Sequence, residues 1–154
     1  YEATTNSSFL IYLIAKDKPE HDEIITKTLE RIQKEINTLS NQLDAHDVNF
    51  IMLEVPKEPE DISEDVVQIM DNRRQFLYEH GFEKQYEIDY LAPNIQDYAS
   101  GEAMDLFIKS NIELTKDIYG PSVKSNYILK YVFANRISRS VIYPLLEQME
   151  LRKR

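Results

Sequence analysis

The sequence has no cysteine, and its three histidines lie far apart along the chain, at His21, His46 and His80. Disulfide bonds and thiolate metal sites are therefore excluded. A zinc centre is not expected either, because zinc needs several nitrogen or sulfur ligands held together. We predict no metal site, and the absence of cysteine fits the reducing cytoplasm where we expect this protein to act.

Long apolar runs and a surplus of positive charge are also missing. No run approaches the roughly 18 apolar residues that a membrane-spanning helix needs, so we expect no membrane partner. Residues 1–6 have neither the basic start nor the apolar core of a signal peptide. The formal net charge is −9, whereas nucleic-acid binding needs a basic face that neutralises phosphates. No nucleic-acid partner is therefore expected.

What the chain does have is the composition of an ordinary globular protein. Its 154 residues are 42% hydrophobic and 29% charged, which predicts a single domain over residues 1–154. The acidic balance promotes solubility, and it also attracts cationic ligands such as amines.

The first half of the chain predicts a strand, a long helix and a second strand. Residues 9–15 form a continuous apolar run typical of a strand that is buried on both faces. Residues 22–44 carry apolar side chains three and four positions apart, which indicates an amphipathic helix. Residues 48–55 form a second apolar strand, which Pro56 ends. This order predicts a βαβ unit with two parallel strands.

The second half predicts a helix from Asp61 to Gly81, since glycine favours the left-handed cap that ends many helices. Residues 82–90 alternate, with Tyr86, Ile88 and Tyr90 on one face, as in an antiparallel strand with one wet face.

The remaining residues predict another strand over 104–108 and two closing helices, over 123–135 and 138–151, the second interrupted by Pro144. The predicted fold class is therefore α/β (α+β), with a mixed sheet, two central parallel strands and C-terminal helices.

These elements, in this order, resemble the GCN5-related N-acetyltransferase (GNAT) superfamily of bacterial type. The strand Ile51–Val55 is similar to the family's "LEV" strand, and the segment from Arg73 to Phe82 is similar to its "R-x-x-F-Y-x-x-x-G-F" pattern. Five later segments resemble the C-terminal part of the sequences of a bacterial subgroup. They are Tyr90-Leu91-Ala92-Pro93, Met104-Asp105-Leu106-Phe107, Lys130-Tyr131, Asn135-Arg136-Ile137 and Leu145-Leu146. The resemblance covers nearly the whole chain from about residue 9 and corresponds to the second half of a full family domain.

The resemblance implies a GNAT-like mixed sheet in which two parallel central strands splay apart to admit acetyl-CoA. It also implies transfer of an acetyl group from acetyl-CoA to a primary amine of a small molecule or a peptide. The residues expected at the cofactor are Leu13, Ile14, Ala15, His21, Ile24, Ile25 and Thr26. In the family the turn before this helix carries glycines that approach the pyrophosphate, whereas residues 21–26 contain no glycine and include Asp22 and Glu23.

Two residues are the candidates for catalysis by this resemblance. Glu54, at the end of a buried strand, would accept a proton from the amine directly or through a bridging water. Tyr78 would protonate the departing thiolate, although the family's tyrosine position, five residues before the Phe of Gly-Phe, is occupied by Leu77. A purely structural alternative is that Glu54 forms an ion pair with Arg73 or Arg74 and holds helix to strand.

Three hypotheses about function remain open. The chain is an active N-acetyltransferase; or it is a degenerate acetyltransferase fold without CoA binding, serving as a binding or assembly module; or it is an unrelated α/β domain. In the third case the strand after Gly81 would be parallel in the sheet. We also expect self-association, as a homodimer, through the sheet edge that the missing half of a family domain would cover.

Overall fold

The computed structural model describes residues 1–11, 20–57, 63–94, 96–98 and 100–153. In chain order the elements are β1 (Ser7–Phe9), α1 (His21–Asp44), β2 (Phe50–Pro56), α2 (Glu64–Glu79), β3 (Glu83–Lys84), β4 (Leu91–Pro93), β5 (Gly101–Ser110), α3 (Lys116–Tyr127), the π-helix η1 (Ile128–Ala134) and α4 (Arg139–Gln148). Helices and a mixed sheet confirm the expected α/β (α+β) class. Among the described residues, no helix is both long and apolar enough to cross a bilayer.

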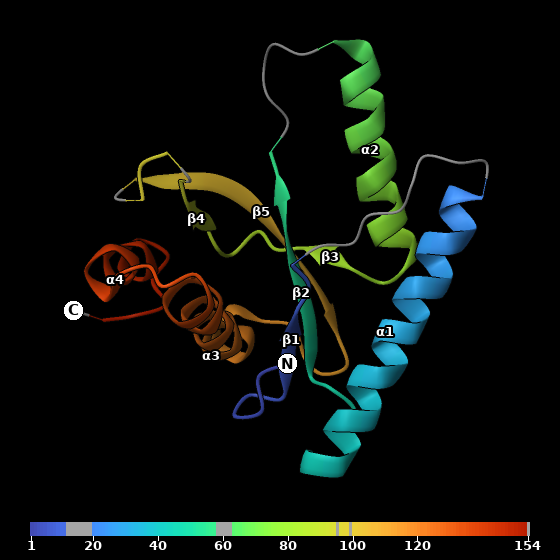
Figure 1. The fold of residues 1–154 in the computed structure, drawn as a ribbon, viewed down its shortest axis with the longest axis horizontal. Helices are drawn as coiled ribbons and strands as arrows, with labels where there is room; N and C mark the ends of the chain where they lie inside the picture. The colour runs from blue at the N-terminus through green and yellow to red at the C-terminus, as the bar shows by residue number, and fades with distance from the viewer. Residues whose placement is uncertain (12–19, 58–62, 95, 99, 154) are drawn as a thin grey trace.

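The sheet separates two layers of helices (Figure 1). One face, which we call the α1 face, is covered by α1 and α2, and the other, the α3 face, is covered by α3, η1 and α4. Alternation along β2 fills both layers, because successive side chains of a strand point to opposite faces. Phe50 and Met52 pack into the core of the α3 face, and Ile51 and Val55 pack into the core of the α1 face.

The strand order is β1-β2-β5-β3, with β4 also paired to β5. β1 and β2 precede and follow α1 in the sequence, and they pair in parallel in the sheet. This confirms the predicted βαβ unit. β5 runs antiparallel to β2 along the whole of β2, and β3 and β4 are antiparallel to β5. The strand after Gly81, β3, is therefore antiparallel to its neighbour β5 and runs in the same direction as β1 and β2.

The parallel pairing of β1 with β2 is short. It runs from Ser7↔Phe50 to Phe9↔Met52, and the Leu10 N–H then donates to the Met52 carbonyl at 2.8 Å. β2 continues for four more residues, to Pro56, paired with β5 alone among the described residues. The predicted strand over residues 9–15 differs from this, since β1 begins at Ser7 and ends at Phe9, and residues 12–19 lie outside the described part of the chain.

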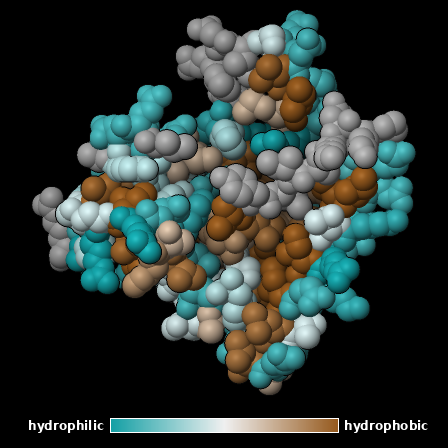
Figure 2. Space-filling model, viewed as in Figure 1, coloured by the Kyte–Doolittle hydropathy of each residue, from teal (hydrophilic) through white to brown (hydrophobic). Residues whose placement is uncertain are grey.

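Helix α1 confirms the helix predicted over 22–44. It ends at Ala45, whose φ of 61° is the left-handed conformation that terminates many helices. Figure 2 shows apolar side chains gathered over β2 and the adjoining side of α1, with hydrophilic side chains along the outer side of that helix. Its amphipathic sequence therefore directs one face toward the sheet, where Leu29 is buried completely.

The end of α2 is fixed by a Schellman motif. The Phe82 N–H donates to the Leu77 carbonyl at 2.9 Å, and the Gly81 N–H donates to the Tyr78 carbonyl at 3.1 Å. Gly81 has a φ of 84°, a backbone conformation that residues other than glycine rarely adopt. Leu77 and Phe82 both lie in the core of the α1 face, which is the apolar contact that accompanies this motif.

Three expected elements need correction. The strand predicted over 82–90 is only Glu83–Lys84, because the chain then leaves β5; Ile88 and Tyr90 enter the core while Tyr86 is 80% exposed. The helix predicted over 123–135 begins earlier, at Lys116, and becomes a π-helix at Ile128. The last helix runs through Pro144 without interruption.

Two contacts besides the pairing with β2 hold β1 in place. Glu2 forms an antiparallel bridge with Ser7 on the outer edge of the strand, with N–H to C=O distances of 2.7 and 3.1 Å. The side chain of Asn126, on α3, donates to the Ser7 hydroxyl at 2.7 Å, and both residues are buried. The first strand is therefore fastened to a helix from the far end of the chain.

Candidate functional site

Glu54 lies on β2 two residues beyond the last position that pairs with β1. By strand alternation its side chain shares the α3 face with Phe50 and Met52. The side chain is only 9% exposed, so the carboxylate must be satisfied by protein groups.

Three donors satisfy it. The Tyr90 and Tyr131 hydroxyls donate to Oε1 at 2.5 and 2.6 Å, and the Lys130 ammonium donates to Oε2 at 2.8 Å. The Lys130 side chain is 15% exposed. Oε1 thus has two phenolic partners, whereas Oε2 has the ammonium alone among the described residues. We call Glu54, Tyr90, Lys130 and Tyr131 the Glu54 cluster.

The two phenols act as donors across the neutral range. Burial raises the pKa of Tyr90 well above its ordinary value, and the neighbouring Glu54 carboxylate raises it further. The pKa of Tyr131 is raised by the same two causes in the same order. Both hydroxyls therefore keep their protons, and Oε1 is held as a hydrogen-bond acceptor.

Lys130 and Tyr131 are neighbours in the π-helix η1, and both reach the Glu54 carboxylate. In η1 the Asn135 N–H donates to the Lys130 carbonyl at 3.0 Å, five residues back, and the turn is widened. π-Helices are rare, and they occur frequently at functional sites.

Aromatic rings complete the cluster. The Lys130 ammonium lies 4.6 Å from the Phe9 ring centre and 4.7 Å from that of Tyr131. Tyr127 packs edge-on against Tyr131, with ring centres 4.7 Å apart, and its hydroxyl donates to the Leu91 carbonyl at 2.8 Å. β1, β2, α3 and η1 thus converge on one charged pair in an aromatic setting.

The structural alternative for Glu54 named the wrong partners. Arg73 is exposed, and Arg74 pairs with Asp105 at 2.8 Å on the α1 face. Lys84 lies 3.6 Å from the same carboxylate. Glu54 does form an ion pair, but it joins β2 to η1 and not to α2.

Tyr78 lies on the α1 face, the face of the sheet opposite to the Glu54 side chain. Its ring packs edge-on against Phe107, with centres 5.5 Å apart, and the residue is 45% exposed. Burial, and next the neighbouring Tyr86, raise the pKa of its hydroxyl. The Schellman motif points Leu77 into the core, and Tyr78 is turned by one helical step from that direction. The structure therefore does not bring the two candidate catalytic residues together.

The described part of the expected cofactor site is the start of α1. Glu20 is the N-cap and makes no side-chain cap, so the first backbone N–H groups are left for another acceptor. However, Asp22 and Glu23 occupy the first turn; Asp22 contacts His21 at 3.1 Å, and Glu23 pairs with Lys27 at 2.7 Å. An acidic first turn does not fit a pyrophosphate, which is itself negative.

The other expected cofactor residues add little to this picture. Ile24 is 43% exposed, and Ile25 and Thr26 are half-buried on the first turns of α1. Leu13, Ile14 and Ala15 lie outside the described residues. Within the described ranges no group of three or more His, Cys, Asp or Glu side chains is arranged to hold a metal ion.

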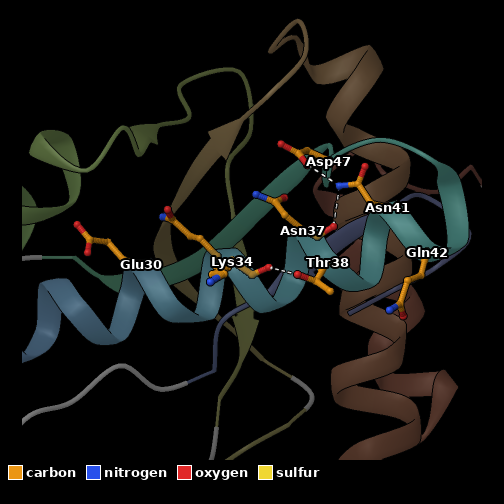
Figure 3. Close-up of a pocket in the computed structure, with 8 residues that line it drawn as sticks. Glu30, Lys34, Asn37, Thr38, Asn41, Gln42 and Asp47 are labelled. Atoms are coloured by element: carbon orange, nitrogen blue, oxygen red, sulfur yellow. Dashed lines mark hydrogen bonds between the residues drawn. The ribbon is translucent and has the colours of Figure 1, made fainter.

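A polar groove of about 770 Å³ lies along α1 beside the segment that enters β2 (Figure 3) and is lined by Glu30, Gln33, Lys34, Asn37, Thr38, Asn41, Gln42 and Asp47. Several of these groups already bond to the protein. The Asn41 amide donates to Asp47 Oδ1 at 2.6 Å, and Asn37 Oδ1 accepts from the Val48 N–H at 3.1 Å. These bonds fasten α1 to the segment entering β2, which is an architectural role.

Sequence reasoning selected Glu54 and missed its partners. Tyr90, Lys130 and Tyr131 were visible as parts of family-like motifs, but nothing in the motifs joins them to a residue 36, 76 or 77 positions away. One general rule could have pointed to them: a buried carboxylate requires hydrogen-bond donors from other parts of the protein.

Comparisons of this chain with protein-family models, with curated proteins and with solved structures give no match. Its function is therefore inferred from the residues and their geometry.

Proposed function

We propose that this chain is an N-acetyltransferase that transfers an acetyl group to a primary amine, with Glu54 as the group that accepts the amine's proton. The observation that carries the proposal is the position of Glu54. It lies on the part of β2 beyond Met52, past the last position that pairs with β1 among the described residues. The resemblance to the GNAT superfamily implies that two such strands separate to admit acetyl-CoA, and this short pairing agrees with that expectation.

Acetyl-CoA as the donor comes from the resemblance alone, and when bound it would supply an activated acyl group. The protein's own contribution is the orientation of one carboxylate. Tyr90 and Tyr131 hold Oε1, and Oε2, which the Lys130 ammonium contacts, is the oxygen that faces a cation. A fixed acceptor within hydrogen-bond reach of the amine is the requirement for general-base assistance.

The primary experiment is binding of acetyl-CoA, measured as a shift in thermal unfolding. A ligand present at about 100 times its dissociation constant stabilises the folded state by about 2.7 kcal/mol. We expect a clear rise in the unfolding temperature at millimolar acetyl-CoA, and no rise would overturn the proposal.

A measurement of the acetyl-transfer rate distinguishes a role of Glu54 in proton transfer from a role in binding acetyl-CoA. Release of the CoA thiol during transfer to a primary amine such as n-propylamine can be followed with a thiol reagent, and the chain adds no background because it has no cysteine. Glu54→Gln is expected to keep acetyl-CoA binding and to lower turnover by about 10²- to 10⁴-fold, the usual contribution of general-base catalysis. An unchanged rate, measured where both proteins are folded, would remove Glu54 from the mechanism.

A second candidate is a degenerate acetyltransferase fold that binds a partner and no CoA. The acidic first turn of α1, with Asp22 and Glu23, is the observation that favours it. It predicts no thermal shift with acetyl-CoA, so the same experiment decides between the two. The expected homodimer stays a prediction, which the mass of the protein in solution tests.

A further inference from the structure

The Lys130 ammonium is surrounded in the way that proteins surround a bound amine. It donates to a carboxylate, Glu54 Oε2, at 2.8 Å and lies 4.6 and 4.7 Å from the ring centres of Phe9 and Tyr131. A carboxylate combined with aromatic faces is the chemistry that recognises ammonium ligands, because ring faces attract cations. These groups come from β1, β2 and η1, so the site is assembled by the tertiary fold.

Two features make Lys130 a replaceable occupant. Its side chain is 15% exposed, so the ammonium has a path to solvent along a flexible four-carbon stem. The carboxylate is meanwhile held by other residues, since Tyr90 and Tyr131 bond to Oε1 and do not depend on the ammonium. The two bonds that hold the carboxylate therefore do not involve Lys130.

We propose that Phe9, Glu54 and Tyr131 form a binding site for a primary alkylammonium ion, which Lys130 occupies until a free amine displaces it. The inference rests on the proposed function for the fate of that amine, which would be the acetyl acceptor. Lys130 then competes with the free amine for the same site and lowers the apparent affinity for the acceptor.

The geometry also limits the kind of cation. Oε1 already accepts from two phenols, and only Oε2 is left for the ligand. A guanidinium gains most when it bonds both oxygens of a carboxylate at once, which this arrangement prevents. An ammonium needs a single acceptor, so the site selects primary amines over guanidines.

Lys130→Ala tests the proposal, with n-propylammonium as the probe because it replaces the atoms that the substitution removes. A tethered group competes at an effective concentration in the millimolar range, so its removal should tighten binding of a free amine. We expect n-propylammonium to bind Lys130→Ala at least about tenfold more tightly than the wild type. n-Propylguanidinium should bind more weakly, and uncharged n-propanol should not bind.

The matched control is the double variant Lys130→Ala with Glu54→Gln, which keeps the vacated space and removes the negative charge. It should show no preference for n-propylammonium over n-propanol. Equal affinity of the amine for Lys130→Ala and wild type, or unchanged affinity in the double variant, would overturn the site.

If Lys130→Ala does not fold, the wild type itself gives the answer by NMR. The ε-methylene of Lys130 carries the ammonium that lies over two rings, so we expect the signal of its protons upfield from that of the exposed Lys27. n-Propylammonium, at a concentration on the order of 100 mM and well above the millimolar range of the tether, should move it toward the Lys27 position. A signal that stays in place would overturn the proposal. No acetyl-CoA is present in these experiments, so their failure is distinguishable from loss of cofactor binding.

Discussion

Glu54 on β2 and Tyr78 on α2 lie on opposite faces of the same sheet. The Glu54 carboxylate is bonded to Tyr90 and Tyr131 on the α3 face, while the Tyr78 ring packs against Phe107 on the α1 face. A small amine held at the carboxylate is therefore screened from the Tyr78 hydroxyl by the strands.

The Glu54–Lys130 pair should contribute strongly to stability. Glu54→Gln leaves the ammonium without its counter-charge in a mostly buried setting, and breaking such pairs typically costs 3–5 kcal/mol; we expect about 3 kcal/mol, because Lys130 retains some exposure. Equilibrium unfolding in urea measures the loss. Glu23→Gln, which breaks the exposed pair with Lys27, is the matched control and should leave stability unchanged. Equal stability of Glu54→Gln and wild type would show that the pair adds nothing.

The hydroxyls of two buried tyrosines should behave oppositely. Tyr131→Phe removes a donor to a carboxylate and should lower the free energy of unfolding by about 2 kcal/mol. Tyr119 is buried, its pKa is raised to about 12 by that burial, and its hydroxyl finds no hydrogen-bond partner among the described residues. Tyr119→Phe should therefore be neutral or stabilising. Urea unfolding of both variants tests the pair, and a destabilised Tyr119→Phe would point to an acceptor for that hydroxyl.

The chain offers a matched pair of glycines. Gly81→Ala forces a left-handed φ on alanine and should cost about 1–2 kcal/mol, although the added Cβ would meet Lys109 only at an ordinary 3.4 Å. Gly120 lies inside α3, where the new Cβ would meet Leu151 at 3.5 Å. Its gain of up to about 1 kcal/mol in helix propensity is opposed by Pro121, whose ring crowds the Cβ of a preceding helical residue, so Gly120→Ala should cost less than Gly81→Ala. Thermal unfolding compares the two variants, and a Gly120→Ala variant less stable than Gly81→Ala would contradict this expectation.

Stability should fall in alkali. Burial raises the pKa values of Tyr90, Tyr119, Tyr127 and Tyr131 above the ordinary value of about 10. Above that pH the unfolded chain releases phenolic protons that the folded chain keeps, so the folded state binds more protons and loses stability as the pH rises. The contribution is complete below about pH 10 and declines above it. Urea unfolding from about pH 8 to about pH 11, with phenolate absorbance as a second signal, should show this decline; constant stability would contradict it.

Local patterns predicted much of the fold. The three- and four-residue spacing of apolar side chains gave α1 almost to the residue, and Gly81 gave the end of α2 because few other residues accept its φ. The parallel βαβ unit followed from the order of elements.

The cluster around Glu54 was out of reach for a physical reason. Its bonds join residues 36, 76 and 77 positions apart, and such pairings are decided by how layers pack rather than by neighbouring residues. The π-helix is equally hidden, because residues 128–134 have the composition of an ordinary helix. β3 is short because the chain leaves β5 so that Ile88 and Tyr90 can pack in the core. The alternation of side chains over residues 82–90 does not predict where the chain leaves the sheet.

The bond from Asn126 to Ser7 spans 119 positions of the chain. A ribosome makes proteins from the N-terminus at about 5–20 residues per second, so the first strand emerges well before the helix that fastens it. During that interval the Ser7 hydroxyl lacks the buried partner that α3 supplies. The burial of β1 against α3 is therefore completed only after synthesis has passed residue 126.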